Sequence, residues 1–195
     1  MSLRLSGGRR LRSPDGAGTR PTAARVRLAV MNLVAPRLAG ARWLDLCCGS
    51  GVMACEALQR GVVAVLAVER QRRVAALADA NLEAIARGLP PESPAASVEV
   101  LAEEVLRVLN RGRGDRPRFD LAYADPPYGS GLYGPMAEAL RHDWLTSEGL
   151  LILEHASATP LAVPSGWREW NRRRYGSCSV LLLEQDRADE GSANG

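Results

Sequence analysis

The sequence predicts an α/β fold: a doubly wound, mostly parallel seven-stranded sheet of the Rossmann-like type that ends in an antiparallel hairpin. Two observations predict the parallel part. Strand-like apolar runs alternate with helical patterns, and residues 62–68 form a continuous apolar run, as a strand covered on both faces requires. The hairpin is predicted because the last two strand-like stretches flank Gly176. The 195 residues accommodate one domain with a substantial core.

The first 27 residues are expected to form an arginine-rich arm ahead of this domain. Residues 1–20 are rich in Arg, Gly and Ser and should be irregular or a short hairpin. Thr22 is a candidate cap for a helix that runs to about Arg37. The domain itself is expected over residues 28–186, and a polar, disordered tail over 187–195.

The domain should open with a strand, a glycine turn and a helix that stops at Gly61. The apolar strand follows, and then the helix with the clearest 3.6-residue period, which stops at Gly88. After a proline-rich loop, strands alternate with helices again. The expected ranges are strands 43–46, 62–68, 97–101, 119–124, 150–154, 167–175 and 179–185, and helices 52–60, 74–87, 103–110 and 133–142.

Composition excludes several classes of protein. With 46% hydrophobic and 24% charged residues, the chain has the composition of an ordinary globular domain. No apolar run approaches the roughly 18 residues of a membrane span, and no hydrophobic signal region opens the chain, so a cytoplasmic protein is expected. The four cysteines lack Cys-x-x-Cys spacing, which favours reduced packing thiols over a zinc site or a disulfide framework.

Charge is unevenly distributed. Residues 1–27 hold seven arginines and one acid, Asp15, although the whole chain has a net charge of only +3. A basic segment beside a globular domain suggests a polyanionic partner such as nucleic acid. A solvated arginine-rich tail is an equally common explanation, so charge alone leaves both readings open.

The glycine turn indicates a cofactor that carries a nucleoside. Residues 49–54 fit the pattern Gly-x-Gly-x-x-Ala between a strand and a helix, where glycine lets a ligand approach the backbone. Glu69 ends the next strand, 20 residues after Gly49, where a carboxylate can accept from both ribose hydroxyls. Together these features favour a nucleoside site over an ordinary tight turn.

Asp45 separates two possible cofactors. It lies inside the strand just before Gly49 and Gly51, where a dinucleotide's pyrophosphate would meet an unfavourable negative charge. A sulfonium or an α-amino group would find the same carboxylate favourable. The position of Asp45 therefore favours S-adenosylmethionine over a dinucleotide.

Asp125-Pro126-Pro127-Tyr128 follows the strand at residues 119–124. The two prolines fix φ and remove two donors, so Asp125 and Tyr128 are held rigidly at the carboxyl edge of the sheet. A planar amine could donate to the Asp125 carboxylate and the Pro126 carbonyl while Tyr128 stacks on its ring. The tetrapeptide alone could equally be a strand-to-helix turn with an acidic cap.

Taken together, these motifs resemble a known family. The run from Asp45 to Gly51, followed 80 residues later by Asp125, is the pairing of class I S-adenosylmethionine-dependent methyltransferases that act on amino groups. With residues 6–11, Arg20-Pro21-Thr22 and residues 25–27 upstream, nearly the whole chain is similar to the RsmD family, which methylates the exocyclic N2 of one guanine in small-subunit (16S) ribosomal RNA. Leu28, Met31 and the pair Cys47-Cys48 depart from the family pattern.

The resemblance implies a role for each candidate residue. Asp125, Pro126, Pro127 and Tyr128 would form the catalytic loop, and Glu103, with Glu104 as its competitor, would approach the adenine amino group. Cys47, as small apolar lining, and Thr22 would join Asp45, Gly49, Gly51 and Glu69 around the cofactor. The expected RNA contacts are Arg9, Arg10, Arg20, Arg25 and Arg27. The expected partner is small-subunit ribosomal RNA within an assembled or partly assembled 30S particle, bound by a monomer.

Other functions remain possible for this fold. An adenine-N6 methyltransferase could use the same loop but normally needs a target-recognition domain for which the chain has no room. A protein glutamine methyltransferase usually carries Asn in place of Asp125. A non-catalytic RNA-binding assembly factor would keep the fold without consuming the cofactor, and a nicotinamide dehydrogenase is disfavoured by Asp45.

Overall fold

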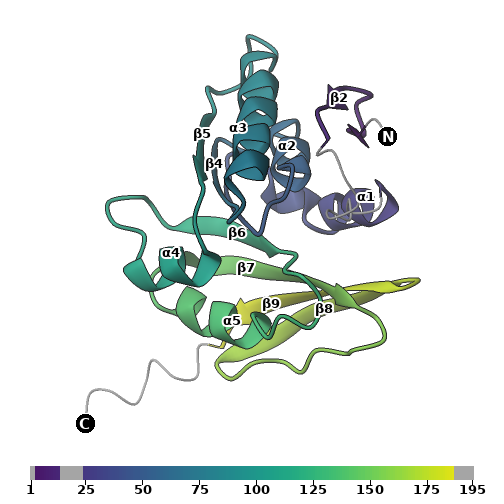
Figure 1. Cartoon of the computed structure of the whole chain (residues 1–195), viewed down its shortest axis with the longest axis vertical. Coiled ribbons are helices and arrows are strands. Elements are labelled where there is room, and N and C mark those ends of the chain that lie inside the picture. Colours follow the sequence, from purple (N-terminus) through teal and green to yellow (C-terminus); the bar gives the residue numbers. More distant parts are fainter. Residues whose placement is uncertain (1–2, 14–23, 187–195) are drawn as a thin grey trace.

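A computed structural model describes residues 3–13 and 24–186 of the chain (Figure 1). Arg20, Pro21, Thr22 and the predicted tail at 187–195 lie outside the described residues. The first described segment is a small antiparallel hairpin of β1 (Leu3–Arg4) and β2 (Arg10–Leu11), which confirms the hairpin alternative for this part of the arm. We call residues 3–13 the hairpin arm.

The main sheet has seven strands in the order β5-β4-β3-β6-β7-β9-β8. The first five are parallel, and β9 runs antiparallel to both of its neighbours. The predicted fold, including the C-terminal hairpin, is confirmed. The strands are β3 (Arg42–Leu46), β4 (Ala64–Val68), β5 (Ser97–Leu101), β6 (Phe119–Ala124), β7 (Leu145–Ala156), β8 (Trp167–Tyr175) and β9 (Cys178–Gln185).

The strand order reverses at β3, which pairs with β4 on one side and with β6 on the other. The connections leaving β3 and β6 therefore diverge and open a crevice at their carboxyl ends, where open α/β sheets bind ligands. Asp45 and Tyr123 are register partners on these two strands, and the rings of Trp43 and Tyr123 stack with centroids 6.1 Å apart. The fold thus brings the two principal motifs of the sequence to one place.

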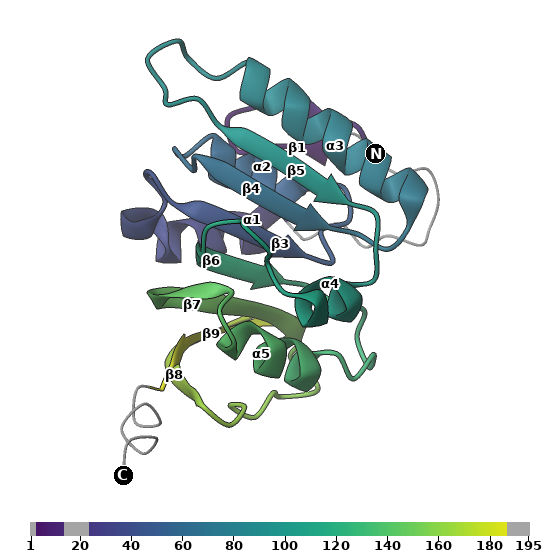
Figure 2. The same cartoon turned by 90° about the vertical axis from the view of Figure 1, so that its left-hand side faces the viewer.

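Helices cover both faces of the sheet, as Figure 2 shows. The larger core cluster packs α1, α2 and α3 on one face, and a second cluster packs α4 and α5 on the other. A residue on a central strand is consequently buried whichever way it points. The helices are α1 (Ala24–Leu33), α2 (Val52–Leu58), α3 (Arg72–Arg87), α4 (Val105–Arg111) and α5 (Tyr133–Arg141).

Two predicted elements have different bounds in the structure. The helix expected to reach Arg37 ends at Leu33, and a separate 3-10 turn covers Ala35–Arg37. Pro36 explains the break, because proline lacks an N–H and disfavours the α region for the residue before it. The strand expected at 150–154 spans Leu145–Ala156 instead. The division expected at residue 27 falls inside α1.

Candidate active site

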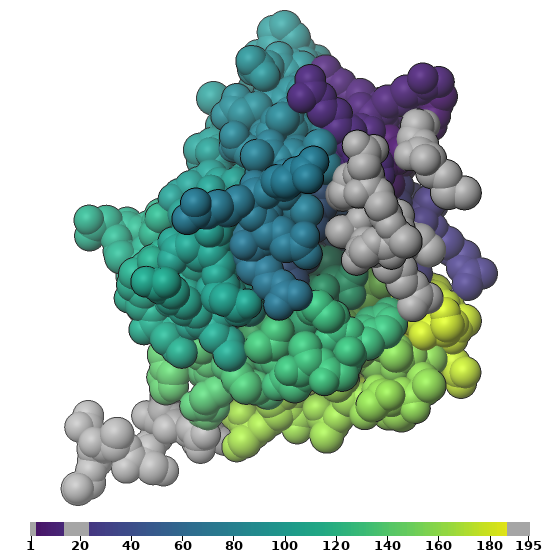
Figure 3. Space-filling view, in the orientation of Figure 1, coloured from purple at the N-terminus to yellow at the C-terminus, as the bar shows by residue number. Residues whose placement is uncertain are grey.

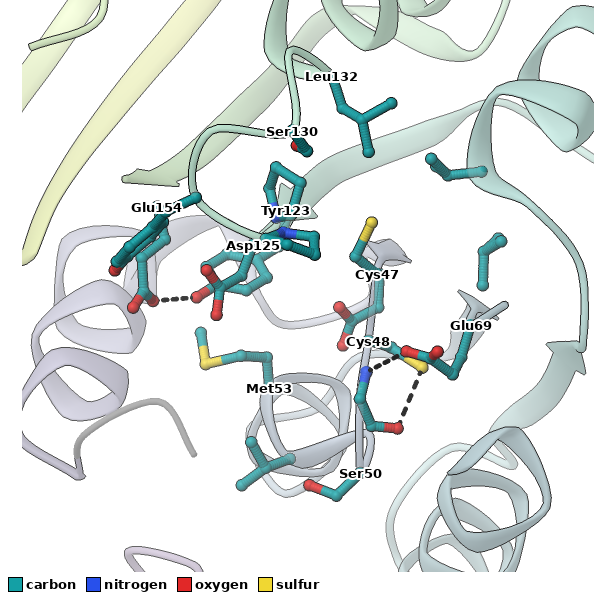
Figure 4. A pocket seen from close by; sticks show the side chains of 18 of the residues that line it. Cys47, Cys48, Ser50, Met53, Glu69, Tyr123, Asp125, Ser130, Leu132 and Glu154 are labelled. Carbon is teal, nitrogen blue, oxygen red and sulfur yellow. Dashed lines mark hydrogen bonds between the residues drawn. The ribbon is translucent and has the colours of Figure 1, made fainter. Parts of the chain in front are cut away.

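A cavity of about 790 Å³ opens at the carboxyl ends of β3, β4, β6 and β7. Its wall contains nine of the residues predicted for catalysis or cofactor binding, and Figure 4 shows Asp125, Tyr123 and Glu154 on one side of it with Glu69 and Ser50 on the other. The structure therefore brings the proposed cofactor end and the proposed substrate end into one cavity. The nine predicted for catalysis or cofactor binding are Asp45, Cys47, Gly49, Glu69, Glu103, Asp125, Pro126, Pro127 and Tyr128, and Arg25, predicted to contact RNA, is a tenth residue of the wall.

The glycine turn after β3 has a backbone that few residues other than glycine adopt. Gly49 and Gly51 have φ of 54° and 73°, in the left-handed region. Gly49 lines the cavity, and a Cβ there would meet nothing within 4 Å. Gly51 precedes α2 and does not line the cavity, and a Cβ there would lie 3.3 Å from the Ala78 Cβ.

Cys47 is held in an unusual conformation at the end of β3. Its φ is 60°, in a region that non-glycine residues enter only at a cost of about 1–3 kcal/mol. Burial and the nearby carboxylate of Glu69 raise the pKa of this thiol to about 12. Cys47 is therefore a neutral, half-buried wall residue, in line with lining rather than nucleophilic chemistry.

Asp45 is a buried carboxylate, with 1% of its surface exposed. Its Oδ2 accepts a hydrogen bond from the Ala54 amide of α2 at 3.1 Å. Its Oδ1 meets no donor at hydrogen-bond geometry among the residues that the structure describes, although the Trp43 side chain lies close enough to affect the carboxyl group. Burial raises the pKa of Asp45 to about 7, against the opposing effects of the Ala54 amide and the Trp43 side chain. A buried, half-satisfied carboxylate of this kind is poised for a cationic or donor group.

Glu69 uses both carboxylate oxygens to organise the neighbouring loops. Oε2 accepts from the Gly49 amide at 3.1 Å, and Oε1 accepts from the Gln71 amide at 2.9 Å. The side chain is buried but belongs to the cavity wall. Glu69 follows β4 and thus fixes the glycine turn that follows the neighbouring strand β3. It still presents a carboxylate to the cavity.

Both candidate adenine contacts lie in the cavity wall. Glu103 forms a two-pronged ion pair with Arg111, at 2.8 and 3.1 Å. Glu104 lies 3.8 Å from Arg70, with both side chains more than half exposed. The pair with Arg111 lowers the pKa of Glu103, so this carboxylate is ionised at neutral pH.

The Asp125 loop follows β6 with its first residues anchored and its last ones exposed. The Asp125 amide donates to the Leu46 carbonyl at 3.4 Å, and Pro126 is buried. Pro127 and Tyr128 project outward, and Tyr128 is 39% exposed. Because two prolines separate the anchored acid from the exposed ring, the loop forms a rigid ledge at the mouth of the cavity.

Sequence reasoning missed a cluster beneath this ledge. The Tyr123 hydroxyl donates to the Glu154 carboxylate, and the Tyr133 hydroxyl donates to the Glu154 carbonyl at 2.9 Å. Tyr175 and Cys178 of the C-terminal hairpin complete the wall on this side. Glu154 could have been found from the sequence, because it ends a predicted strand just as Glu69 does.

The predicted RNA contacts fall into three groups. Arg9, Arg10 and Arg25 are exposed, and Arg25 lines the cavity. Arg20 lies outside the described residues. Arg27, expected to bind phosphate, is 4% exposed, and its guanidinium donates to the Arg4 carbonyl at 2.6 Å. The expectation for Arg27 was therefore wrong, because α1 turns this side chain into the protein.

Arg27 belongs to a network that fastens the hairpin arm to α2. Its Nε lies 3.7 Å from the buried Glu56, which also accepts from the Ser6 amide and hydroxyl at 2.8 and 2.7 Å and from Arg60 at 2.6 Å. Burial alone would raise the pKa of Glu56, but the bonds from Ser6 and Arg60 outweigh burial and lower it. Arg27 thus acts in the structure as a counterion of Glu56, the carboxylate to which Ser6 of the hairpin arm is hydrogen-bonded.

Comparisons with known proteins agree with this geometry. The family described as Conserved hypothetical protein 95 matches residues 5–184. The ribosomal RNA small subunit methyltransferase D of Escherichia coli K12 is 28% identical over 189 residues, covering 96% of this chain and 90% of the relative. The protein of the same name from Haemophilus influenzae is 28% identical over 178 residues, 91% of this chain and 89% of the relative.

A solved structure shares the whole fold. The Escherichia coli protein yhhF superimposes with a TM-score of 0.78 at 26% identity, covering 95% of this chain and 99% of the other. The family match runs from residue 5 in the hairpin arm to residue 184 in β9, so it includes all the residues that line the cavity except Leu3. The chain belongs to the family described as Conserved hypothetical protein 95, and this confirms the expected membership of the RsmD family.

Proposed function

We propose that the chain is an S-adenosylmethionine-dependent methyltransferase that modifies the exocyclic N2 of a guanine in small-subunit ribosomal RNA. The observation that carries the proposal is the single cavity that holds Asp45 and Glu69 at one end and the Asp125 loop at the other. Family membership and the names of the relatives support an rRNA substrate. The guanine N2 as target comes from the resemblance to the RsmD family.

The residues at the β3–β4 end suit the proposed cofactor. Among the described residues, no donor meets Asp45 Oδ1 at hydrogen-bond geometry, and a cationic amino group would satisfy this buried acceptor. Gly49 has open space where a side chain would stand, and Glu69 offers a carboxylate to hydroxyl donors such as those of a ribose. When bound, S-adenosylmethionine supplies an activated methyl group. Asp45, Gly49 and Glu69 would hold it, and Glu103 or Glu104 would meet its base.

The Asp125 loop would orient the amine that accepts the methyl group. The Asp125 carboxylate and the Pro126 carbonyl are acceptors on a fixed backbone, so two N–H donors of one amine can be aligned by them. Asp125 also stabilises the positive charge that builds on nitrogen. Tyr128, exposed at the end of the ledge, would stack on the base, and such stacking contributes about 1–3 kcal/mol per base.

The substrate is proposed to be the rRNA of an assembled or partly assembled 30S particle, bound by a monomer in the cytoplasm. The exposed Arg9, Arg10 and Arg25 are suited to phosphate contacts. Taking a base out of structured RNA costs a few kcal/mol, which stacking on Tyr128 would partly offset. None of the described helices has the length and apolar character needed to cross a membrane.

Two substitutions test whether the cavity has a cofactor end at Glu69 and a separate substrate end at Asp125. We expect Asp125→Ala to abolish methyl transfer to small subunits that lack the modification, while cofactor affinity stays within about threefold, because Asp125 faces the amine. Glu69→Ala should weaken cofactor binding by at least about tenfold, because the ribose partner and the brace of Gly49 are both lost. Transfer is measured with labelled cofactor followed by nuclease digestion and mass spectrometry, and affinity by calorimetry.

Asp115→Ala is the matched control, since Asp115 is an exposed acid in the loop before β6 and outside the cavity wall. It should change neither quantity. Equal losses of cofactor affinity in Asp125→Ala and Glu69→Ala would contradict this division. Normal RNA binding without any N2-methylguanosine would reject the enzyme and favour a non-catalytic assembly factor.

A further inference from the structure

Glu154 is a buried carboxylate in the cavity wall to which the methyl transfer described above assigns no role. It is 4% exposed and lies near the carboxyl end of β7. A charge in such a position is costly to bury unless something satisfies it. Tyr123, 2% exposed, donates to Glu154 Oε2. The Cys178 thiol is a second, weak donor to the same carboxylate. Because a carboxylate offers about four acceptor sites, Glu154 can still serve another donor.

The register of the sheet puts Glu154 beside Asp125. Ala124, the last residue of β6, pairs with Leu153 of β7 in parallel register, so Asp125, the first residue after β6, follows beside Glu154 of β7. Such strands lie about 4.8 Å apart, and register partners point to the same face. Figure 4 shows both side chains on the same side of the cavity as Tyr123.

Electrostatics agree with a shared location. Burial, then Asp125 and Glu154, raise the pKa of the Tyr133 phenol above its usual value. Burial and Glu154, with Asp125 adding to them, raise the pKa of Cys178 to about 12. Two neutral groups thus respond to both carboxylates, so the two negative charges converge on one part of the cavity.

Two adjacent carboxylates match the donor edge of guanine. Guanine presents N1–H and the N2 amine side by side, which are neighbouring donors. Adenine presents its amine beside N1, a lone-pair acceptor that a carboxylate repels. With Asp125 and the Pro126 carbonyl occupied by N2, Glu154 is the acidic group in the described wall of this end that can meet N1–H.

We propose that Glu154 is a specificity-determining residue that accepts N1–H of the target guanine, with Tyr123 as the positioning residue that holds its carboxylate. This proposal rests on the proposed function and names the part of the base that the site reads. A site built to pair with a donor rejects an analogue that lacks it, because the buried acceptor is left unpaired. Glu154 would thereby exclude adenine and any purine without N1–H.

The test compares guanine with 2-aminopurine, which keeps the N2 amine but has an acceptor at N1. Small subunits are reconstituted with rRNA that carries either base at the modified position, and kcat/KM for methyl transfer is measured. The wild-type chain should prefer guanine on the order of 100-fold. In Glu154→Gln the amide can donate to N1 of 2-aminopurine, so this preference should fall to within about tenfold.

Tyr123→Phe is the matched control, because it removes the hydrogen bond to Glu154 and keeps the carboxylate, whereas Glu154→Gln keeps an acceptor for Tyr123 and removes the negative charge. It should lower kcat/KM a few-fold for both bases and leave the preference near its wild-type value. Cofactor affinity, measured in parallel, confirms that each variant is folded. An equal fall of the preference in Tyr123→Phe and Glu154→Gln would overturn the direct contact, since disturbed packing of this wall would then be enough to explain both.

The remaining outcomes separate this proposal from the function on which it rests. If the wild-type chain methylates guanine N2 but accepts 2-aminopurine equally well, Glu154 does not read N1 and only this inference fails. That result needs no variant to fold. If the wild-type chain forms no N2-methylguanosine, the proposed function fails and the inference fails with it.

Discussion

At the scale of single residues, Asp45 has the most unusual chemistry. Its carboxyl is buried, one oxygen lacks a hydrogen-bond partner in the described chain, and burial raises its pKa to about 7. Between the usual pKa of 3.8 and this value, the folded state binds the proton more tightly than the unfolded state does. Stability contributed by this proton is therefore present at low pH and is lost as pH rises through about 7.

We expect the cofactor-free protein to lose about 2–3 kcal/mol of unfolding free energy between pH 5 and pH 8 through Asp45. Asp45→Asn removes the titration and keeps an acceptor for the Ala54 amide. The stability difference between Asp45→Asn and wild type should therefore grow with pH, as urea unfolding at several pH values would measure. A difference that does not change with pH would show that Asp45 is not protonated in the folded state.

The residues that the sequence predicted well have a backbone reason for their position. Gly49 needs positive φ, and Asp125 precedes two prolines, so local chemistry alone marks both of them. Glu154 has no such backbone reason, although the sequence places it at the end of a predicted strand. Its partnership with Tyr123 depends on pairing β6 with β7 in one register out of several, and short-range patterns carry no information about register. The burial of Arg27 was missed for a similar reason, since its partner Glu56 is distant in the chain.

At the scale of elements, Asn81 links the hairpin arm to the glycine turn. Its Oδ1 accepts from the Arg12 amide, and its Nδ2 donates to the carbonyls of Arg12 and Ser50, all at 3.0 Å. Ser50 and Ser13 both line the cavity. One buried side chain on α3 therefore fixes two segments of the cavity wall at once.

Replacing Asn81 by Ala should lower the unfolding free energy by about 2–3 kcal/mol, because buried backbone groups lose their partners. The amides of Arg12 and Ser13 should then exchange hydrogen faster than those of β3, which hydrogen-exchange mass spectrometry can resolve. Asp79→Ala, at an exposed position of the same helix, serves as the control and should change stability by less than about 0.5 kcal/mol. Unchanged exchange in Asn81→Ala would mean that other contacts hold the arm.

The first half of strand β7 could not be predicted from the sequence. Residues 150–154 are continuously apolar up to Glu154 and were predicted, but Thr146, Ser147 and Glu148 lack an alternating pattern. They extend the strand because Phe119 pairs with Leu145 and the register then shifts to pair Leu121 with Leu150. At Gly149 a Cβ would lie 2.9 Å from the Leu145 side chain, so the irregularity requires glycine.

At the scale of the whole molecule, the C-terminal hairpin and α1 meet at the mouth of the cavity. Tyr175 and Gly176 line it together with Arg25, whose guanidinium lies against Gly176. Figure 3 shows the tip of this hairpin next to α1. Arg173 and Arg174 are exposed on β8 just before this tip. Segments from both ends of the chain thus place positive charge around one opening.

This arrangement predicts that Arg25→Gln weakens RNA binding and reduces the slope of log affinity against log salt by about 0.7–0.9, the value for one lost phosphate contact. Arg168 lies at the opposite end of β8, where it pairs with Glu184 at 3.0 Å. Arg168→Gln is therefore the control and should leave the slope unchanged. Fluorescence anisotropy with labelled rRNA at several salt concentrations measures both, and equal slopes for the two variants would contradict the prediction.

The overall architecture was predictable because strand–helix alternation admits few topologies. The sequence also indicated that Asp45, Glu69 and Asp125 meet, since parallel strands end at one edge of the sheet. Closure of the cavity by Tyr175 and Cys178 was not predictable, because it depends on how far the antiparallel β9 overlaps β7. The sequence thus predicts which residues at the ends of parallel strands reach the cavity. It does not predict which residues of the antiparallel hairpin reach it.

The anchoring of the hairpin arm has a consequence for the order in which segments of the chain can fold during synthesis. Ser6, Arg12 and Arg9 find their partners 50, 69 and 79 residues later in the chain. At synthesis rates of about 5–20 residues per second, Arg12 waits about 3–14 s before Asn81 is joined to the chain. The hairpin arm is therefore fixed well after it is translated, and it completes the cavity only after α3 has been made.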